Sequence, residues 1–434
     1  MPSMNSKIIL FLFFTTSISF PQELLTPEEA IKIALQNNYS ISIARNESEI
    51  AANNSDIGNA GFLPNLEATG SYSKSVYNTR LSGEQRERDG VKSSTLTAGI
   101  SLNWTIFDGL RMFASLNRLK TLNKTGELNF KFEVENNITD ITTTYYNIVR
   151  LKEVLEVIQT NILISEERVK IAEDKLEVGS GSRFDLRQAQ VNLNEDKSSF
   201  LREQLNLSQA KILLNSLLGL ETNNNFNVID TITLKDNLVL ENLFFAAEEK
   251  NSSLKIAEES RTISELDISL ARSEIFPRVS LNAGYNFTES ESEAGLLQIN
   301  RNYGFNYGIT ASLNIFNGLN TRRSIENAQI NLKNTELAYK EVKQLVKSEL
   351  YNSFDIYESS RKIVELEKQN LIAAEENLDI ALERLRLGNI TPLEFRETQI
   401  NLFNAKSRLV AAQFEAKSAE TELLRLSGQL ITDL

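Results

Sequence analysis

The sequence has 434 residues, and none of them is cysteine or histidine. Without cysteine the chain has no disulfides, thiolate zinc sites, iron–sulfur clusters or thiol nucleophile. Without histidine it has no Ser-His-Asp triad, no imidazole-bound haem and almost no route to zinc catalysis. Carboxylate chemistry would remain, but no glycine-rich phosphate loop or marked cleft accompanies it. We therefore predict no enzymatic activity, no catalytic residues, no metal and no cofactor.

Helix-breaking residues are scarce, with 18 Gly and 6 Pro. A chain that avoids both is expected to contain long helices. Its charge is unbalanced toward acid, since 46 Lys and Arg face 58 Asp and Glu for a formal charge of -12. This sign makes nucleic acid an unfavourable partner.

The N-terminus has the pattern of an export signal. Lys7 precedes an apolar run from Ile8 to Phe14, and small residues follow up to a Ser17-x-Ser19 pattern. The run is too short to cross a bilayer as a helix, so residues 1–19 are predicted to be a cleaved signal peptide. The alternative is a buried first strand. No later run approaches the length of a membrane-spanning helix.

The rest of the chain contains two copies of one unit. Several short motifs recur 209 residues later: Phe107-Asp108-Gly109-Leu110 as Phe316-Asn317-Gly318-Leu319, Leu176-Glu177-Val178-Gly179 as Leu385-Arg386-Leu387-Gly388, and Leu217-Leu218-Gly219 as Leu426-Ser427-Gly428. One constant offset over so many markers indicates a duplication. We assign residues 20–220 to the first repeat, 221–236 to a linker and 237–430 to the second repeat.

Each repeat is predicted to run helix, strand, strand, very long helix, turn, helix. Thr26 and Pro27 supply an N-cap and a first helical residue, and that helix continues to about Ala60 with breaks near residues 37–40. The long helices cover about 109–178 and 318–387, roughly 100 Å each at 1.5 Å per residue. Turns at about 179–182 and 388–391 lead to return helices at about 183–219 and 392–427.

Apolar residues in the long helices recur every seven positions, which is typical of coiled-coil packing. There are two stripes on each helix: Leu371, Leu378, Leu385 and Leu366, Ala373, Ile380, Leu387 in the second repeat, with Ile162, Val169, Leu176 and Val157, Ile164, Ile171, Val178 in the first. Two stripes suit a helix with a neighbour on each side, as in a curved wall. An ordinary helical bundle is the alternative.

Four strands are predicted, at about 65–76, 94–107, 278–289 and 302–316. Each alternates an apolar face, such as Leu96 to Ile106 in even positions, with a face of small uncharged residues. Such segments of about ten residues are typical of outer-membrane strands. A half-buried soluble sheet shows the same alternation. Strand length, aromatic content and the charged segments 80–92 and 289–301 at one end favour the membrane.

Four strands cannot close a barrel alone, and an open edge in lipid would leave amide groups unpaired. Copies must therefore share one barrel. A dimer would give eight strands, an interior that side chains fill, and a trimer twelve, which leaves a channel. Strand count alone does not choose between them.

Taken together, these features resemble the TolC-like outer-membrane efflux proteins over essentially the whole mature length. The matching residues are Phe62-Leu63-Pro64 and Ile275-Phe276-Pro277 before the first strand of each repeat, and Phe107-Asp108-Gly109 and Phe316-Asn317-Gly318 after each strand pair. The resemblance implies a mainly α fold with a homotrimeric twelve-stranded outer-membrane β-barrel, continued by a periplasmic α-helical coiled-coil tunnel. It also implies a passive exit duct for efflux or type I secretion, docked to a periplasmic adaptor and an inner-membrane pump or ABC transporter.

The turns at the ends of the long helices are the candidate partner site. A glycine just past a helix end takes the left-handed cap conformation, and a plain helix–helix turn would explain it alone. The resemblance adds adaptor contact for six residues: Val178, Gly179, Ser180, Leu387, Gly388 and Asn389.

Acidic residues beyond the turns are the candidate aperture. Glu394 and Glu397 follow the second turn, and Asp185 occupies the first of these positions in the first repeat. By resemblance they would face the lumen as carboxylate rings that attract cations and raise their own pKa values. A solvated helix face is the alternative. Where some relatives carry a gate-locking arginine this chain has Asn389, and Arg396 or Arg183 are the available substitutes.

Two other classes remain for comparison. One is a periplasmic coiled-coil scaffold with a soluble sheet, which would need no detergent for extraction. The other is a carboxylate enzyme such as a glycosidase, which no motif supports. The cargo and the choice between efflux and secretion are not encoded in any motif of the chain.

Overall fold

The structure is a computed structural model that describes residues 24–80, 87–235, 238–293 and 298–431. The predicted signal peptide, residues 1–19, lies outside these ranges. The described chain divides into two compact units. We call residues 39–139, 235–356 and 419–434 the sheet unit, and the chain up to Asn38 with residues 140–234 and 357–418 the hairpin unit. Helices α3 and α7 contribute residues to both.

The elements follow the same order in both halves of the chain. The first half runs through α1 (Pro27–Asn37), α2 (Tyr39–Asn54), β2 (Asn65–Arg80), β3 (Glu87–Phe107), α3 (Arg111–Glu177) and α4 (Arg183–Leu218). The second half runs through α5 (Leu240–Lys250), α6 (Ser252–Ser273), β5 (Arg278–Ser292), β6 (Ile299–Ser312), α7 (Asn320–Arg386) and α8 (Pro392–Leu426). Both long helices have 67 residues, and α7 begins and ends 209 residues after α3.

The first helix begins as predicted. The Thr26 side chain accepts a hydrogen bond from the Glu29 amide, the Glu29 carboxylate accepts from the Thr26 amide, and Pro27 occupies the first helical position. The predicted break near residues 37–40 is confirmed at Asn38, whose extended backbone separates α1 from α2. The helical region ends at Asn54, earlier than the predicted Ala60. Past Asn54 the Asp56 side chain bonds the Gly58 amide instead, an Asx turn that competes with helix.

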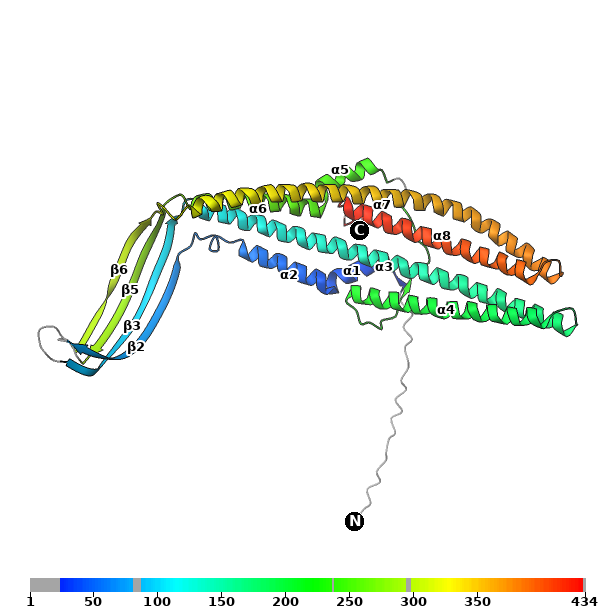
Figure 1. Ribbon diagram of the computed structural model, residues 1–434, viewed down its shortest axis with the longest axis horizontal. Coiled ribbons are helices and arrows are strands. Elements are labelled where there is room, and N and C mark those ends of the chain that lie inside the picture. The colour runs from blue at the N-terminus through cyan, green and yellow to red at the C-terminus, as the bar shows by residue number, and fades with distance from the viewer. Residues whose placement is uncertain (1–23, 81–86, 236–237, 294–297, 432–434) are drawn as a thin grey trace, which may run out of the picture. The chain divides into compact units, whose positions relative to one another are not determined.

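The four long strands form one antiparallel sheet in the order β2-β3-β5-β6 (Figure 1). In the described chain neither outer strand, β2 nor β6, pairs with another strand on its far side. A second, two-residue parallel pair joins β1 (Leu24–Leu25) to β4 (Asn227–Val228), so part of the segment predicted as a linker is paired.

The strands differ from their predicted limits at both ends of the sheet. β2 and β3 extend through Arg80 and from Glu87, because backbone pairing continues beyond the apolar zone that the alternation marks. The segment 80–92, predicted as a charged connection, is therefore partly strand. β6 was predicted to reach residue 316 but ends at Ser312. Its partner β5 begins at Arg278 after Pro277, which has no amide hydrogen to extend the ladder.

The two faces of the sheet follow the predicted alternation. The apolar face is exposed to solvent in the single chain, and its most exposed residues include Leu66, Tyr72, Tyr303, Phe305, Tyr307 and Ile309. The ring centroids of Tyr285 and Phe305 lie 5.3 Å apart on this face, which confirms the register. An exposed apolar surface of this kind marks contact with an apolar environment.

Four helices of the sheet unit lie side by side in the same order as the strands to which they connect. α2 leads into β2, α3 leaves β3, α6 leads into β5 and α7 leaves β6. Arg45 of α2 lies over the Phe130 ring of α3 at 5.7 Å, and Arg118 of α3 donates to Asp267 of α6 at 2.7 Å. The Glu274 carboxylate, just past α6, receives a hydrogen bond from Thr321 of α7 at 3.4 Å. The helices therefore form a row α2-α3-α6-α7.

In the hairpin unit, α3 and α4 form one antiparallel helical hairpin and α7 and α8 another (Figure 1). Leu378 and Leu385 of the first predicted stripe are buried in a cluster with Ala381, Phe395 and Leu402. The second stripe of α7 is exposed instead: Leu366, Ala373, Ile380 and Leu387. In α7 a single chain therefore buries only one of the two predicted stripes. In α3, Ile162 of the first stripe and Ile164 and Ile171 of the second are all partly buried against core clusters. No described helix is apolar enough over sufficient length to cross a membrane.

Candidate functional site at the hairpin ends

The first hairpin ends in a left-handed glycine cap, as predicted. Gly179 has a φ of +76°. The Ser180 amide donates to the Lys175 carbonyl at 2.8 Å, and the Gly179 amide donates to the Leu176 carbonyl at 3.1 Å. These two bonds are the Schellman pattern, which satisfies carbonyl groups at the end of α3 that have no helical partner.

The second hairpin repeats this geometry. Gly388 has a φ of +75°, the Asn389 amide donates to the Arg384 carbonyl at 2.8 Å, and the Gly388 amide donates to the Leu385 carbonyl at 3.1 Å. An added Cβ at either glycine would meet no atom within 4 Å. Backbone conformation, and not lack of space, therefore requires glycine at both turns.

Each turn presents an exposed aliphatic side chain. Val178 is 77% exposed and Leu387 is 71% exposed, and Ser180 and Asn389 beside the glycines are exposed as well. Single exposed apolar residues are ordinary. Here two occupy equivalent positions at the ends of two hairpins that pack together, since Lys175 Nζ donates to the Leu385 carbonyl at 3.0 Å. The six predicted turn residues therefore belong to one end of the hairpin unit.

Glu394 has a local role that the sequence reading missed. Its carboxylate accepts hydrogen bonds from the Thr391 amide at 2.7 Å and the Thr391 hydroxyl at 2.9 Å, and its amide donates to that hydroxyl at 3.2 Å. This is a capping box at the start of α8. The bonds from the Thr391 amide and hydroxyl lower the pKa of Glu394. The ring hypothesis predicts a raised pKa. In the single chain the direction is the opposite, because the Glu394 carboxylate accepts the two hydrogen bonds from Thr391.

The three predicted acidic residues do not converge in one chain. Glu397 is exposed one turn after Glu394 on α8, whereas Asp185 lies half-buried on α4. Asp185 lines a groove between α4 and α8, and neither glutamate does. Of the two candidate arginines, Arg183 is exposed, whereas Arg396 lies in that groove.

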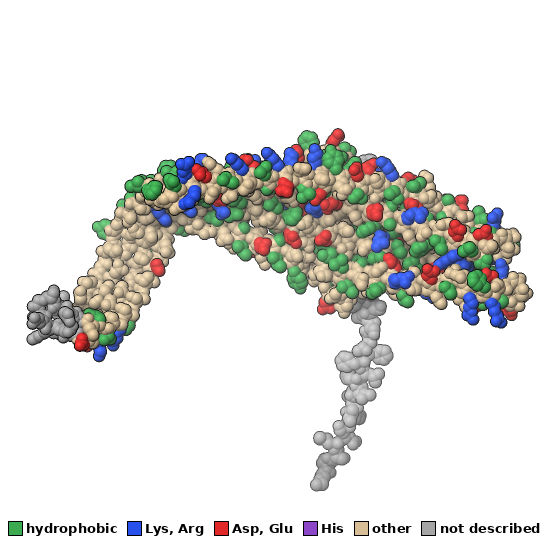
Figure 2. Space-filling model, viewed as in Figure 1, with side chains coloured by type: hydrophobic (Ala, Val, Ile, Leu, Met, Phe, Trp, Pro, Cys, Tyr) green, Lys and Arg blue, Asp and Glu red, His purple; other side chains and the backbone are tan. Residues whose placement is uncertain are grey.

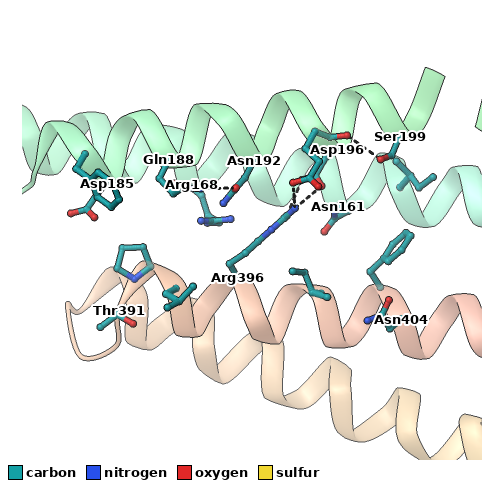
Figure 3. Close-up of a pocket in the computed structure, with 17 residues that line it drawn as sticks. Asn161, Arg168, Asp185, Gln188, Asn192, Asp196, Ser199, Thr391, Arg396 and Asn404 are labelled. Carbon is teal, nitrogen blue, oxygen red and sulfur yellow. Dashed lines mark hydrogen bonds and ion pairs between the residues drawn. The ribbon is translucent and has the colours of Figure 1, made fainter. Parts of the chain in front are cut away.

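A polar network that the sequence reading did not find joins the two hairpins (Figure 3). Arg396 of α8 forms a two-pronged ion pair with Asp196 of α4, with Nη1–Oδ2 at 3.0 Å and Nη2–Oδ1 at 2.9 Å. Ser165 of α3 donates to the same carboxylate at 2.5 Å. The Asp196 side chain is 7% exposed and that of Arg396 is 12% exposed. Such a pair is costly to break from one side, because the remaining charge stays buried.

Gln399 extends this network to α3. Its amide nitrogen donates to the Asn161 carbonyl and to the Ser165 hydroxyl, each at 3.0 Å. Its amide oxygen accepts from Arg168 at 3.3 Å and from Arg396 at 3.2 Å. Burial lowers the pKa of Arg168 to about 10, assisted by the neighbouring charge of Arg396. Three helices are therefore held together by one set of buried hydrogen bonds.

Arg168, Asp196 and Arg396 of the network also line a groove of about 940 Å³ near the hairpin ends (Figure 3). Its apolar lining includes Phe184, Leu393, Ile400 and Phe403. The sequence did contain a signal for the network. Ser165, Arg168 and Ala172 lie on one face of α3, so a charged residue lies between two small residues there. The partner Asp196 could not be chosen from the sequence, because α4 also carries Asp185, Glu195 and Glu203 and no local pattern distinguishes among them.

Long antiparallel hairpins are combined in this chain with a sheet whose apolar face is exposed, as expected of a membrane-associated protein. A model of the outer membrane efflux protein family matches residues 30–220 and again residues 244–429. The chain therefore belongs to the outer membrane efflux protein family, and the resemblance found in the sequence is confirmed. It is an outer-membrane channel of the efflux class that extends into the periplasm. Membership favours the channel over the periplasmic scaffold.

Individual relatives are distant but match over most of their length. The outer membrane efflux protein BepC of Brucella suis is 20% identical over 415 residues, which is 93% of this chain and 85% of the relative. The outer membrane protein TolC of Escherichia coli is 24% identical over 376 residues, 80% of this chain and 74% of the relative. The crystal structure of the Campylobacter jejuni CmeC outer membrane channel aligns with a TM-score of 0.78 at 16% identity, covering 99% of this chain and 94% of that one.

Proposed function

We propose that three copies of this chain form a twelve-stranded barrel in the outer membrane and a helical tunnel in the periplasm, through which solutes leave the cell. The observation that carries the proposal is the unfinished sheet. β2 and β6 are both open edges, they run in opposite directions, and the apolar face between them is exposed. Antiparallel pairing of β6 with β2 of the next copy would close the barrel and satisfy both edges.

The helices at the two ends of the row support the same closure. The row α2-α3-α6-α7 ends in α2, which exposes Ile43 and Ile50 seven residues apart, and in α7, which exposes Ile330 and Leu337 at the same spacing. A seven-residue apolar spacing on both edges suits knobs-into-holes packing between copies. The exposed second stripe of α7 in the hairpin unit, Leu366 to Leu387, adds a further surface for a neighbouring copy.

Contacts within the sheet unit indicate which residues would meet. Gly126 of α3 lies beside Ala51 of α2. Arg111 at the start of α3 and Thr321 at the start of α7 both contact the Glu274 carboxylate, at 3.8 and 3.4 Å, so the two helices begin at one level. Ile50 precedes Ala51 and therefore lies near the level of Gly126 in α3. The position of α7 equivalent to Gly126 is 209 residues later, two residues before Leu337.

The absence of native cysteine makes this pairing testable. A chain with Ile50→Cys and Leu337→Cys should form disulfide-linked dimers and trimers in isolated outer membranes under mild oxidation. Ile50→Cys with Ser269→Cys is the matched control, because Ser269 lies on α6 inside the row and should not reach α2 of another copy. A detergent-free monomer in plain buffer, or no linked species from the first pair, would overturn the proposed assembly.

The partner site in this proposal is the pair of hairpin ends. Val178 and Leu387 with their glycine turns would contact the helical hairpin of a periplasmic adaptor, which connects the duct to an inner-membrane pump or transporter. Leu387→Asp combined with Val178→Asp should then abolish export in the host bacterium while the trimer still reaches the outer membrane. Normal export by this variant would exclude the hairpin ends as the adaptor contact.

The acidic residues remain candidates for the aperture. In a trimer Glu394, Glu397 and Asp185 would each occur three times, and the carboxylates could attract cations at the hairpin end. The capping role of Glu394 makes Glu397 the cleaner test, because Glu397 forms no part of the capping box. In planar bilayers Glu397→Gln should lower cation preference. An unchanged preference would remove the ring.

A further inference from the structure

The polar face of the sheet is almost uncharged. It consists of odd-numbered residues from Asn65 to Tyr77 in β2 and from Val91 to Thr105 in β3, and of even-numbered residues of β5 and β6. Asn, Ser, Thr and Gly account for most of them, and the polar side of the sheet in Figure 2 shows few hydrophobic or charged side chains between its ends. Within these described stretches the charged residues of the face are Glu67 and Arg278.

Several uncharged side chains of this face bond one another across neighbouring strands. Asn286 donates to the Asn306 side chain at 3.1 Å, and Asn282 donates to the Thr310 hydroxyl at 3.1 Å. A Cβ added at Gly99 would lie 2.3 Å from the Asn286 side-chain oxygen. Glycine therefore leaves the space that the amide of a neighbouring strand occupies. Cross-strand hydrogen bonds of this kind pair the polar groups of this face with one another.

Glu67 differs from every neighbour on the face. It is exposed, and the residues in its row across the sheet are Ser101, Gly284 and Asn306, none of which is charged. Arg278 bonds the Thr105 hydroxyl at 3.1 Å. Thr105 is four residues from Ser101 along β3, about 13 Å at the usual rise of a strand. This separation exceeds the screening length of physiological salt, about 8 Å, so Arg278 does not neutralise Glu67.

We propose that Glu67 sets the charge preference of the barrel, so that neutral and cationic solutes pass this segment more readily than anionic ones. The inference rests on the proposed function, because it requires the polar face to line a water-filled lumen. Three copies would place three carboxylates at one level of an otherwise uncharged wall surrounded by lipid. A low-dielectric wall concentrates the field of such charges in the lumen and raises the local concentration of counter-ions.

Charged thiol reagents measure this field even if the hairpin ends are shut. Thr69 lies two residues from Glu67 on the same face of β2, about 7 Å away along the strand. In the cysteine-free chain, Thr69→Cys supplies one thiol per copy. The rates at which cationic and anionic methanethiosulfonate reagents modify it, divided by their rates with a free thiol, give the local preference. At low salt Glu67→Gln should lower the cation-to-anion ratio by about tenfold, and high salt should shrink the difference.

Controls separate this inference from the proposed function. Glu291→Gln removes a carboxylate from the opposite face of the sheet and should leave the ratio unchanged. If Thr69→Cys reacts but Glu67→Gln does not alter the ratio, the role of Glu67 is overturned and the lumen stands. If Thr69→Cys is inert in the membrane while Ala68→Cys on the other face reacts with both reagents, the polar face does not line a lumen, and the proposed function fails as well.

Discussion

The sheet and the hairpin ends solve the problem of unsatisfied groups in opposite ways. The network around Asp196 buries charged groups and pairs them within the chain. The sheet instead exposes an apolar face and leaves two backbone edges open. The difference shows that the network is complete in a single chain, whereas the sheet would be completed by lipid and by further copies under the proposed assembly. Substitutions in the network should therefore change stability whether or not other copies are present. The stability of the sheet should depend on the membrane and on assembly.

The largest effect is expected for Asp196→Ala. The substitution leaves Arg396 and Arg168 buried without their carboxylate, which should cost about 3–5 kcal/mol of unfolding free energy. The denaturation midpoint, followed by the helical signal in circular dichroism, measures it. Asp196→Leu with Arg396→Leu should recover part of the loss, since both charges of the pair are removed while Arg168 remains buried and bonded to Gln399. A small loss for Asp196→Ala would mean that the network is not closed within the chain.

A charge on the apolar face should have the next largest effect. Phe305→Arg places a guanidinium toward lipid, which costs about 2–4 kcal/mol near the membrane centre. Asn302→Arg, three residues earlier in the same strand, puts the same group on the polar face and should be tolerated. The amount of each variant assembled in the outer membrane provides the measurement. Equal assembly of both variants would contradict the assignment of the faces.

Glycine at the hairpin ends should matter less. Gly388→Ala must adopt a positive φ, which costs on the order of 1 kcal/mol in a residue with a Cβ. Gly304→Ala in β6 is the control, because an added Cβ there meets nothing within 4 Å and its φ is not positive. The shift in denaturation midpoint should be visible for the first variant and absent for the second. A shift of equal size in both would mean that the positive φ of residue 388 is not the reason for glycine there.

The smallest effect concerns acid stability of the hairpin unit. Burial raises the pKa of Glu153, and the charges of Glu156 and Asp230 add to the shift. A carboxyl group with a raised pKa holds its proton more tightly in the folded state, so stability falls as the pH rises from the ordinary carboxyl range through the folded pKa. Glu153→Gln should remove this decline and be at least as stable as the original chain at neutral pH. Exposed Glu336→Gln should retain the original pH profile of unfolding.

Much of the fold could be read from the sequence because it rests on local periodicity. The scarcity of Gly and Pro predicted the long helices, and the seven-residue stripes predicted coiled-coil packing between them. Strict alternation predicted the strands, and Gly179 and Gly388 predicted the caps. The predicted ends of the strands were less accurate. β6 ends at Ser312 because its partner β5 begins at Arg278, directly after Pro277. Thr391-Pro392-Leu393-Glu394 repeats the capping pattern found at Thr26, so the role of Glu394 could have been recognised.

What the sequence determined by itself was the periodic part: two repeats at one offset, their helices and strands, and the two faces of each strand. These follow from backbone geometry, which sets a period of 3.6 in helices and 2 in strands. Only the tertiary structure decided which residues meet across elements. The pairing of Arg396 with Asp196 joins residues 200 apart in the chain. The row of Glu67 likewise brings Gly284 and Asn306, from the second half of the chain, into line with Glu67 and Ser101 from the first. Helix packing and strand register set such contacts, and no local pattern encodes them.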